Sequence, residues 1–360
     1  MATAIWVLND QLHQAQAALA SHGPGEARVV VVEAEAVLRQ RPHLQKQILF
    51  WSAQRHFAAE LRQAGWQVDQ LEAASHSEAL IPWLKQHGIS RLLVMAPPDR
   101  PIRQAIDRLA QQSNWPCELE WIDNNQFLWT AEEFSRWAGS KKQLRMEFFY
   151  REGRKRFNVL MDGDQPQGGQ WNFDQDNRKP PKKGLEGPAP LWFEPDAITT
   201  AVIEKLQTLA ERYELPGDSE PFCWGVTQHQ AQQVLEHFIA TRLAGFGPYQ
   251  DAMVSGQPTL WHSLISPYIN LGLLQPLAVI RQLEQAGSAQ QVPLASLEGV
   301  IRQLLGWREF THGLYHHFGE NYSHSNALEA VVPLPQFLHE LGGSGMGCVD
   351  TVLSELNERG

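Results

Sequence analysis

The chain has 360 residues, 43% of them apolar, which is enough for two domains with ordinary cores. Its 30 basic and 40 acidic residues give a net charge of −10, which argues against indiscriminate nucleic-acid binding through overall charge but leaves room for a local basic groove. The three cysteines, Cys117, Cys223 and Cys348, are far apart and no apolar run could cross a bilayer, so a reducing, cytoplasmic setting without a disulfide framework is predicted.

Short apolar runs alternate with amphipathic stretches over residues 1–135. In the stretch from Gln45 to Ala64, for example, Phe50, Phe57 and Leu61 recur with the period of a helix face. Strands that alternate with helices predict an α/β domain with a parallel, doubly wound sheet. The predicted strands are Ala4–Leu8, Val29–Val32, Gln67–Leu71, Arg91–Met95 and Leu119–Ile122.

Polar residues follow the first two predicted strands. Asp10 and Gln11 come after the first strand, and Glu33 ends the second. Ligands of such sheets bind beyond the carboxyl ends of the strands, so these side chains are candidates for a binding site. No G-x-G-x-x-G motif follows the first strand, which argues against a dinucleotide of the usual kind. Asp10 is equally well interpreted as a helix N-cap.

Residues 136–196 are predicted to connect two domains. The segment from Arg145 to Arg156 is rich in basic residues and is interpreted as a solvated helix face or as a surface for DNA or domain contact. From Met161 to Pro195 the chain is rich in Gly, Pro, Asp and Asn, which predicts a long segment without regular structure. The aromatic and amide residues within Gly168–Arg178 indicate that this loop is packed.

Residues 197–360 are predicted to be helical almost throughout. A hydroxyl-rich turn, Ser263 to Ser266, precedes Pro267, which favours either an anion site or an ordinary N-cap. Trp307 and Arg308 would add an aromatic plate and a cation to a pocket for a flat, phosphate-bearing cofactor; a core aromatic and a helix-borne ion pair are the alternatives. The predicted helices are Ala197–Tyr213, Gln228–Ala244, Leu273–Ala286, Leu294–His317, Ala327–Leu341 and Met346–Leu356.

Two motifs in this half resemble the flavin-binding domain of the photolyase/cryptochrome family. They are Ser-x-x-Ser-Pro-Tyr-x-x-x-Gly from Ser263 to Gly272 and Gly-Trp-Arg-Glu-Phe from Gly306 to Phe310. The chain is similar in particular to the prokaryotic, deoxyribodipyrimidine photolyase-related branch, which carries an iron–sulfur cluster and repairs (6-4) lesions. The loop Gly168–Arg178 also matches that branch.

The resemblance implies two cofactor sites. An antenna chromophore similar to a ribolumazine is expected in the N-terminal domain, and FAD is expected in the all-helical domain. Residues that match the antenna site are Asp10, Gln11, Glu33, His43 and Lys46. Residues that match the FAD site are Tyr249, Ser263, Leu264, Ile265, Ser266, Gln303, Trp307 and Arg308.

The resemblance also implies that the family's flavin domain continues past Gly360, so the helical domain is expected to be incomplete here. Cys348 matches the first cysteine of the branch's [4Fe-4S] cluster, and one cysteine alone cannot build that cluster. No catalytic residue is assigned, because the branch's catalytic histidine pair is expected beyond Gly360.

Two functions follow as hypotheses. The first is light-driven, flavin-dependent repair of pyrimidine photoproducts in DNA, of the (6-4) type, with damaged DNA as the partner. The alternative is a chromophore-binding, light-sensing protein without catalytic activity, or an inactive fragment. A bound near-ultraviolet chromophore without flavin would favour the alternative.

Overall fold

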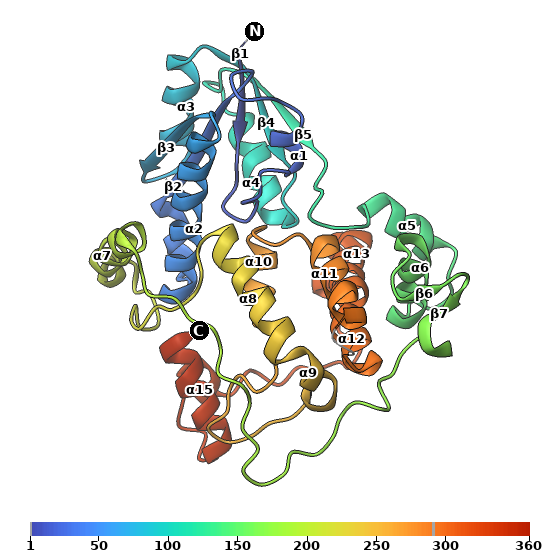
Figure 1. The fold of residues 1–360 in the computed structure, drawn as a ribbon. Coiled ribbons are helices and arrows are strands. Elements are labelled where there is room, and N and C mark those ends of the chain that lie inside the picture. Colours follow the sequence, from blue (N-terminus) through green and yellow to red (C-terminus); the bar gives the residue numbers. More distant parts are fainter. Residues whose placement is uncertain (1, 290–291) are drawn as a thin grey trace. The chain divides into compact units, whose positions relative to one another are not determined.

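The computed structural model describes residues 2–289 and 292–360. It forms two compact units, which are described separately (Figure 1). The first unit contains Met1–Asn124, Trp192–Thr227 and Asn326–Gly360, and the second contains Asn125–Leu191 and Gln228–Ser325. Within the described residues, none of the helices has the length and apolarity that a bilayer crossing demands.

The first unit is built on a sheet of five parallel strands in the order β3-β2-β1-β4-β5. Strands β2 and β3 extend the sheet on one side of β1, whereas β4 and β5 extend it on the other. The predicted doubly wound parallel sheet is therefore confirmed. The strands are β1 (Ala2–Trp6), β2 (Arg28–Ala34), β3 (Gln67–Ala73), β4 (Ile89–Met95) and β5 (Glu118–Ile122).

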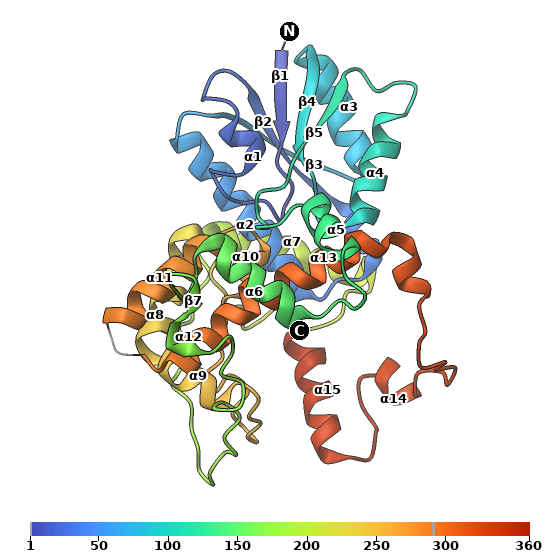
Figure 2. The same cartoon turned by 90° about the vertical axis from the view of Figure 1, so that its right-hand side faces the viewer.

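Helices cover both faces of this sheet, as parallel sheets require. The face that carries Trp6, Val30 and Val94 packs on α3 and α4 through residues such as Leu84 and Ile106. Figure 2 shows α3 and α4 on the opposite side of the strands from α1 and α2. The helices are α1 (Ala17–Ala20), the 3-10 helix η1 (Glu35–Gln40), α2 (Leu44–Gln63), α3 (His76–Gln86) and α4 (Arg100–Ala110).

Three later helices also belong to the first unit: α7 (Ala197–Tyr213), α14 (Gln336–His339) and α15 (Gly347–Arg359). Helix α7 packs on α2, so it groups with the sheet and not with the helical range 197–360 in which it was predicted. The predicted helix Ala327–Leu341 is wrong apart from α14. Pro333 and Pro335 disfavour a helical conformation in the residues before them, and the chain there is irregular.

The second unit is helical, as predicted for the C-terminal half. Helix α12 (Leu294–Ile301), the π-helical stretch η3 (Arg302–Arg308) and α13 (Glu309–Phe318) form one continuous rod, against which α9, α11, α5 and α6 pack. The other helices are α5 (Ala131–Gly139), α6 (Met146–Phe157), α8 (Gln228–Thr241), α9 (Leu243–Tyr249), α10 (Ser266–Asn270), α11 (Pro276–Ala289) and the 3-10 helix η4 (Gly319–His324).

The predicted connector, residues 136–196, contains α6 where a helix face was expected at Arg145–Arg156. The stretch that was predicted to lack regular structure begins with a short hairpin of β6 (Met161–Asp162) and β7 (Gln165–Pro166), followed by a single 3-10 turn, η2 (Gln167–Gly169). Within this connector, residues 136–191 belong to the second compact unit and residues 192–196 to the first. The compact units therefore divide the chain at other residues than the predicted ranges 1–135, 136–196 and 197–360.

Candidate functional site

In the first unit, the carboxyl ends of β1 and β4 mark the point where the strand order reverses. Open α/β sheets bind ligands at this point. Asp10 and Gln11 follow β1, and Gln11 Nε2 donates to the carbonyl oxygen of Met95, the last residue of β4, at 2.8 Å. Gln11 is fully buried, and its amide oxygen has no hydrogen-bond partner among the described residues. Two predicted antenna residues thus lie where a ligand is expected.

Asp10 has an unusual carboxyl group. Burial raises the pKa of Asp10 to about 6; a backbone hydrogen bond at Asp10 opposes this shift and the charge of Asp99 adds to it. A carboxyl group of this kind titrates near neutral pH, so its charge can respond to a ligand or to a modest pH change.

The Asp10→Asn variant is expected to gain stability relative to the wild type as the pH rises from about 4 to 8. The folded-state pKa of about 6 lies above the ordinary value of 3.8, so the stability that Asp10 contributes is present at low pH and lost as the pH rises through 6. The full shift corresponds to about 3 kcal/mol. Urea unfolding at several pH values measures it, with the exposed Asp218→Asn as the control variant.

Glu33, also predicted for the antenna site, is 1% exposed and already paired. The Arg55 guanidinium makes two hydrogen bonds to its carboxylate, from Nε to Oε1 at 2.6 Å and from Nη2 to Oε2 at 2.7 Å. Lys205 of α7 donates to Oε2 at 3.0 Å. The carboxylate therefore ties β2 to α2 and α7, and its oxygens are taken up by protein donors.

His43 is the N-cap residue of α2, and Lys46 lies in the first turn of this helix. His43 Nδ1 accepts from the backbone N–H of Gln45 at 3.1 Å, and its Nε2 lies 3.2 Å from the carbonyl oxygen of Asn357. The ring packs so tightly on Gly217 that a Cβ there would come within 1.9 Å of Nε2. Lys46 is exposed, with its amine 5.7 Å from the Phe50 ring centroid. His43 therefore has a structural role in holding α2, whereas Lys46 is accessible.

In the second unit, the predicted phosphate-binding bend precedes a helix of only five residues, α10. Leu264 has a φ of 57°, a left-handed conformation that costs a residue with a side chain on the order of 1 kcal/mol. Ile265 is 2% exposed, Ser263 is half-buried and Ser266 is exposed. Nearby, the Tyr249 ring lies 4.6 Å from that of Trp261. Strained residues of this kind concentrate at ligand clamps, so the bend is a reasonable candidate for one.

The second predicted element of the FAD site coincides with the π-helical stretch η3. Single π turns inside α-helices occur often at functional sites. Gln303 and Trp307 are exposed, Trp307 to 45%, and Gln303 Nε2 lies 3.4 Å from the carbonyl oxygen of Gly299. Both side chains are accessible to a ligand.

Arg308 is different, because protein groups surround its guanidinium. Nη1 donates to the carbonyl oxygen of Gln126 at 3.0 Å and to Glu309 Oε1 at 3.1 Å, and the guanidinium carbon lies 3.8 Å from the Phe127 ring centroid. Burial lowers the pKa of Arg308, against the attraction of Glu309. The arginine thus fixes the segment after β5 to the rod.

Glu309 completes this attachment. Its Oε2 accepts from the backbone N–H groups of Leu128 and Trp129, at 2.8 and 3.1 Å. Burial raises the pKa of Glu309 to about 7, although Arg308 and the two amides favour the charged form. Burial, together with the charges of His316 and Arg308, lowers the pKa of neighbouring His312 to about 3, so this ring is neutral at ordinary pH.

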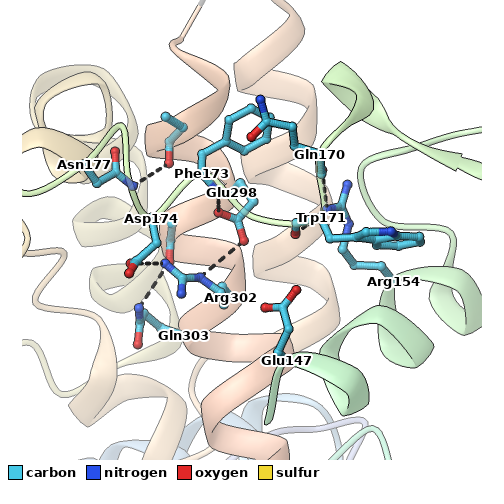
Figure 3. A network of polar contacts seen from close by, with 12 residues as sticks. Glu147, Arg154, Gln170, Trp171, Phe173, Asp174, Asn177, Glu298, Arg302 and Gln303 are labelled. Atoms are coloured by element: carbon cyan, nitrogen blue, oxygen red, sulfur yellow. Dashed lines mark hydrogen bonds and ion pairs between the residues drawn. The ribbon is translucent and has the colours of Figure 1, made fainter. Parts of the chain in front are cut away.

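A polar network that the sequence did not reveal holds the Gly168–Arg178 loop (Figure 3). Arg302 donates to Asp174 at 2.7 Å and lies 3.3 Å from Glu298, which accepts from the backbone N–H of Phe173 at 3.1 Å. Asn177 donates to the carbonyl oxygen of Ala295 at 3.1 Å. The prediction that this loop is packed is therefore confirmed. The i,i+4 spacing of Glu298 and Arg302 is the signal that could have revealed part of the network.

Cys348, the predicted cluster ligand, is exposed near the start of α15. Over residues 2–289 and 292–360, no three His, Cys, Asp or Glu side chains are grouped so that they could hold a metal ion. Cys348 is therefore a single candidate ligand within the described part of the chain.

The chain is similar in sequence to several known proteins. A family model described as deoxyribodipyrimidine photo-lyase-related protein matches residues 5–224. The chain is 37% identical over 366 aligned positions to a (6-4) photolyase of Agrobacterium fabrum, an alignment that covers 99% of this chain and 71% of that protein. An uncharacterised protein of Acanthamoeba polyphaga mimivirus is 26% identical over 144 positions, which cover 39% of this chain and 72% of the viral protein.

A crystal structure of a bacterial class III photolyase from Agrobacterium tumefaciens shares the fold. The TM-score is 0.61 at 18% sequence identity, and the superposition covers 100% of this chain and 70% of that one. At this identity the match shows the architecture alone, a parallel sheet followed by many helices.

Proposed function

The chain belongs to the deoxyribodipyrimidine photolyase-related family, and on this premise we propose that it repairs (6-4) photoproducts in damaged DNA by a light-driven, flavin-dependent reaction. The observation that carries the proposal is the 37% identity to a (6-4) photolyase along 99% of the chain.

A bound, reduced flavin would supply the electron for the photochemical step. The residues of the second unit would hold and orient it. Ser263 and Ser266 would offer hydroxyls to its phosphates, and Gln303 and Trp307 would contact it from the exposed side of η3. The support is the exposure of Ser266, Gln303 and Trp307, together with the left-handed Leu264 and the π-helical backbone. Arg308 would act indirectly, by holding the segment at Gln126 and Phe127 in place.

An antenna chromophore, for which a ribolumazine is the expected type, is proposed at the β1–β4 end of the sheet. Gln11 would offer its buried amide oxygen, and Asp10 its readily protonated carboxyl. Lys46, which is exposed, is a third candidate contact. Glu33 and His43 would support this region through the contacts already described.

The full-length protein, supplied with FAD and reduced, is expected to restore intact pyrimidines in an oligonucleotide that carries one (6-4) photoproduct. Restoration should require near-ultraviolet or blue light and should be absent in the dark, because the electron transfer needs the excited flavin. Chromatography of the digested oligonucleotide measures it. A protein that holds flavin but leaves the lesion intact under light would overturn the proposed activity.

Flavin binding is tested by Trp307→Ala. Loss of a stacked aromatic ring is expected to weaken flavin retention by up to about tenfold, as measured by flavin absorbance after gel filtration. Phe318→Ala is the matched control, since Phe318 is similarly exposed, at 43%, on the same helical rod. Equal retention in both variants would remove Trp307 from the flavin site.

A further inference from the structure

A cavity in the second unit lies between α5, α6 and the loop at Trp171. Its volume is about 470 Å³. The wall carries four cationic side chains, three aromatic rings and a single carboxylate. The lining residues are Trp137, Ser140, Lys141, Lys142, Gln143, Phe148, Arg151, Glu152, Lys155 and Trp171. None of them belongs to the flavin or antenna residues discussed above.

The cations of this cavity, which we call the α5–α6 cavity, have few protein partners. Lys141, Lys142 and Lys155 are exposed, and no salt bridge joins them to a carboxylate within the described residues. Arg151 is paired with Glu147 one helical turn earlier, at 2.9 Å. A protein of net charge −10 thus has a local concentration of positive charge, which attracts an anion.

The aromatic rings lie among these cations. Lys155 Nζ is 5.4 Å from the Trp171 ring centroid, and the Arg151 guanidinium is 5.6 Å from Trp171 and 5.7 Å from Phe148. Lys141 Nζ is 5.9 Å from Trp137. The Phe148 ring is 46% exposed, so a flat group could stack on it.

The loop side of the cavity is held by hydrogen bonds and ion pairs. Arg154 is fully buried, donates to the carbonyl oxygen of Trp171 at 2.9 Å, and places its guanidinium 5.4 Å from the Trp171 ring (Figure 3). The network of Asp174, Glu298 and Arg302 anchors the following residues of the loop. Trp171 is therefore prepositioned, which lowers the entropy cost of binding.

The spacing along α6 distinguishes this cavity from an ordinary solvated helix face. Phe148, Arg151 and Lys155 recur at three and four residues, so they form one stripe along the helix. Alternating cations and rings beside a cavity match the two parts of a nucleotide, because phosphates pair with cations and every base offers a face for stacking.

We propose that the α5–α6 cavity binds nucleotides of a single-stranded nucleic-acid segment, with phosphates at Lys141, Lys142 and Lys155 and a base on Phe148 or Trp171. The proposal rests on the proposed function only in the choice of DNA as the strand. The cavity would provide a contact for the strand besides the lesion-binding flavin pocket, independent of damage and light.

The test is the affinity of the full-length protein for an undamaged, fluorescein-labelled oligothymidylate, measured in the dark by fluorescence anisotropy. The variant Lys141→Gln/Lys155→Gln is expected to bind roughly tenfold more weakly at low salt. The slope of log K against log salt concentration should fall by about 1.4, since each phosphate contact to a single strand contributes about 0.7. Phe148→Ala should weaken binding by about fivefold or more through lost stacking.

Lys182→Gln/Lys183→Gln is the matched control, because it removes two exposed lysines of the same unit that do not line the cavity. Thermal unfolding checks that all variants fold. Equal affinities of the two double variants, or no binding by the wild type, would overturn the proposal. Competition by thymidine monophosphate as strong as that by the strand would overturn the strand as the ligand. Dark binding is read without any repair, so failure here is distinguishable from failure of the photochemical function.

Discussion

Arg302→Met is expected to destabilise the second unit by about 3–5 kcal/mol, because it leaves a carboxylate without its charge partner in the interior. Glu298 is 0% exposed, and Arg302 is its paired guanidinium at 3.3 Å. Asp174 would lose the same cation at 2.7 Å. Urea unfolding, followed by circular dichroism at neutral pH, measures the loss.

The stability lost in Arg302→Met should increase with pH. Burial raises the pKa of Glu298, and Arg302 counteracts this rise. Without the arginine the pKa rises further, so Glu298 in the folded variant is protonated at low pH and the cost of a buried charge disappears there. The difference in the free energy of unfolding between the wild type and Arg302→Met is therefore expected to grow as the pH increases from mildly acidic to alkaline values.

Two further variants sharpen this test. Arg178→Met removes the other cation paired with Asp174, but its side chain is 61% exposed, so about 0–1 kcal/mol is expected. Glu298→Gln with Arg302→Met should recover most of the stability, because no unpaired charge remains. If Arg302→Met costs no more than Arg178→Met, the network contributes little to the attachment of the loop.

Arg55→Met is expected to cost about 3 kcal/mol in the first unit, the low end for a broken buried pair, because Lys205 still neutralises part of the charge on Glu33. The two N–H···O bonds at 2.6 and 2.7 Å would be lost. The midpoint of urea unfolding gives the change, and the wild-type slope should be retained if only stability has changed.

Arg28→Met serves as the control for this variant. Arg28 pairs with Asp69 on adjacent strands of the same sheet, at 2.9 Å, but both side chains are about one-third exposed. Its loss should cost about 0–1 kcal/mol. A small effect of Arg55→Met, together with a loss of antenna chromophore, would return Glu33 to the list of ligand contacts and contradict its structural role.

The fold could be predicted from sequence to the extent that local patterns determine it. The β-branched run at Val29–Val32 and the alternation of strands and helices were sufficient for the parallel sheet, and the period of Leu294–His317 was sufficient for the rod. The grouping of α7 with the sheet was not predictable in this way, because it depends on Lys205 reaching Glu33 across 172 positions of the chain.

Fewer contacts of the candidate site could be predicted from the sequence. Gln11 lies at the expected edge, because the carboxyl ends of parallel strands share it. The motif around Trp307 could not show that Arg308 binds backbone and ring atoms of Gln126 and Phe127, since these contacts are tertiary. Nor could composition distinguish the α5–α6 cavity from a solvated basic face, because the distinction depends on where Trp171 lies.

The π-helical backbone of Arg302–Arg308 also affects how this rod should be aligned with its relatives. A π turn accommodates one residue more than an α turn does, so α12 and α13 are out of phase with each other by about one position. A single periodic template drawn through both would therefore assign the wrong face to residues on one side of the turn. Insertions and deletions of one residue in homologous chains are best placed within 302–308, where the backbone already absorbs such a change of phase.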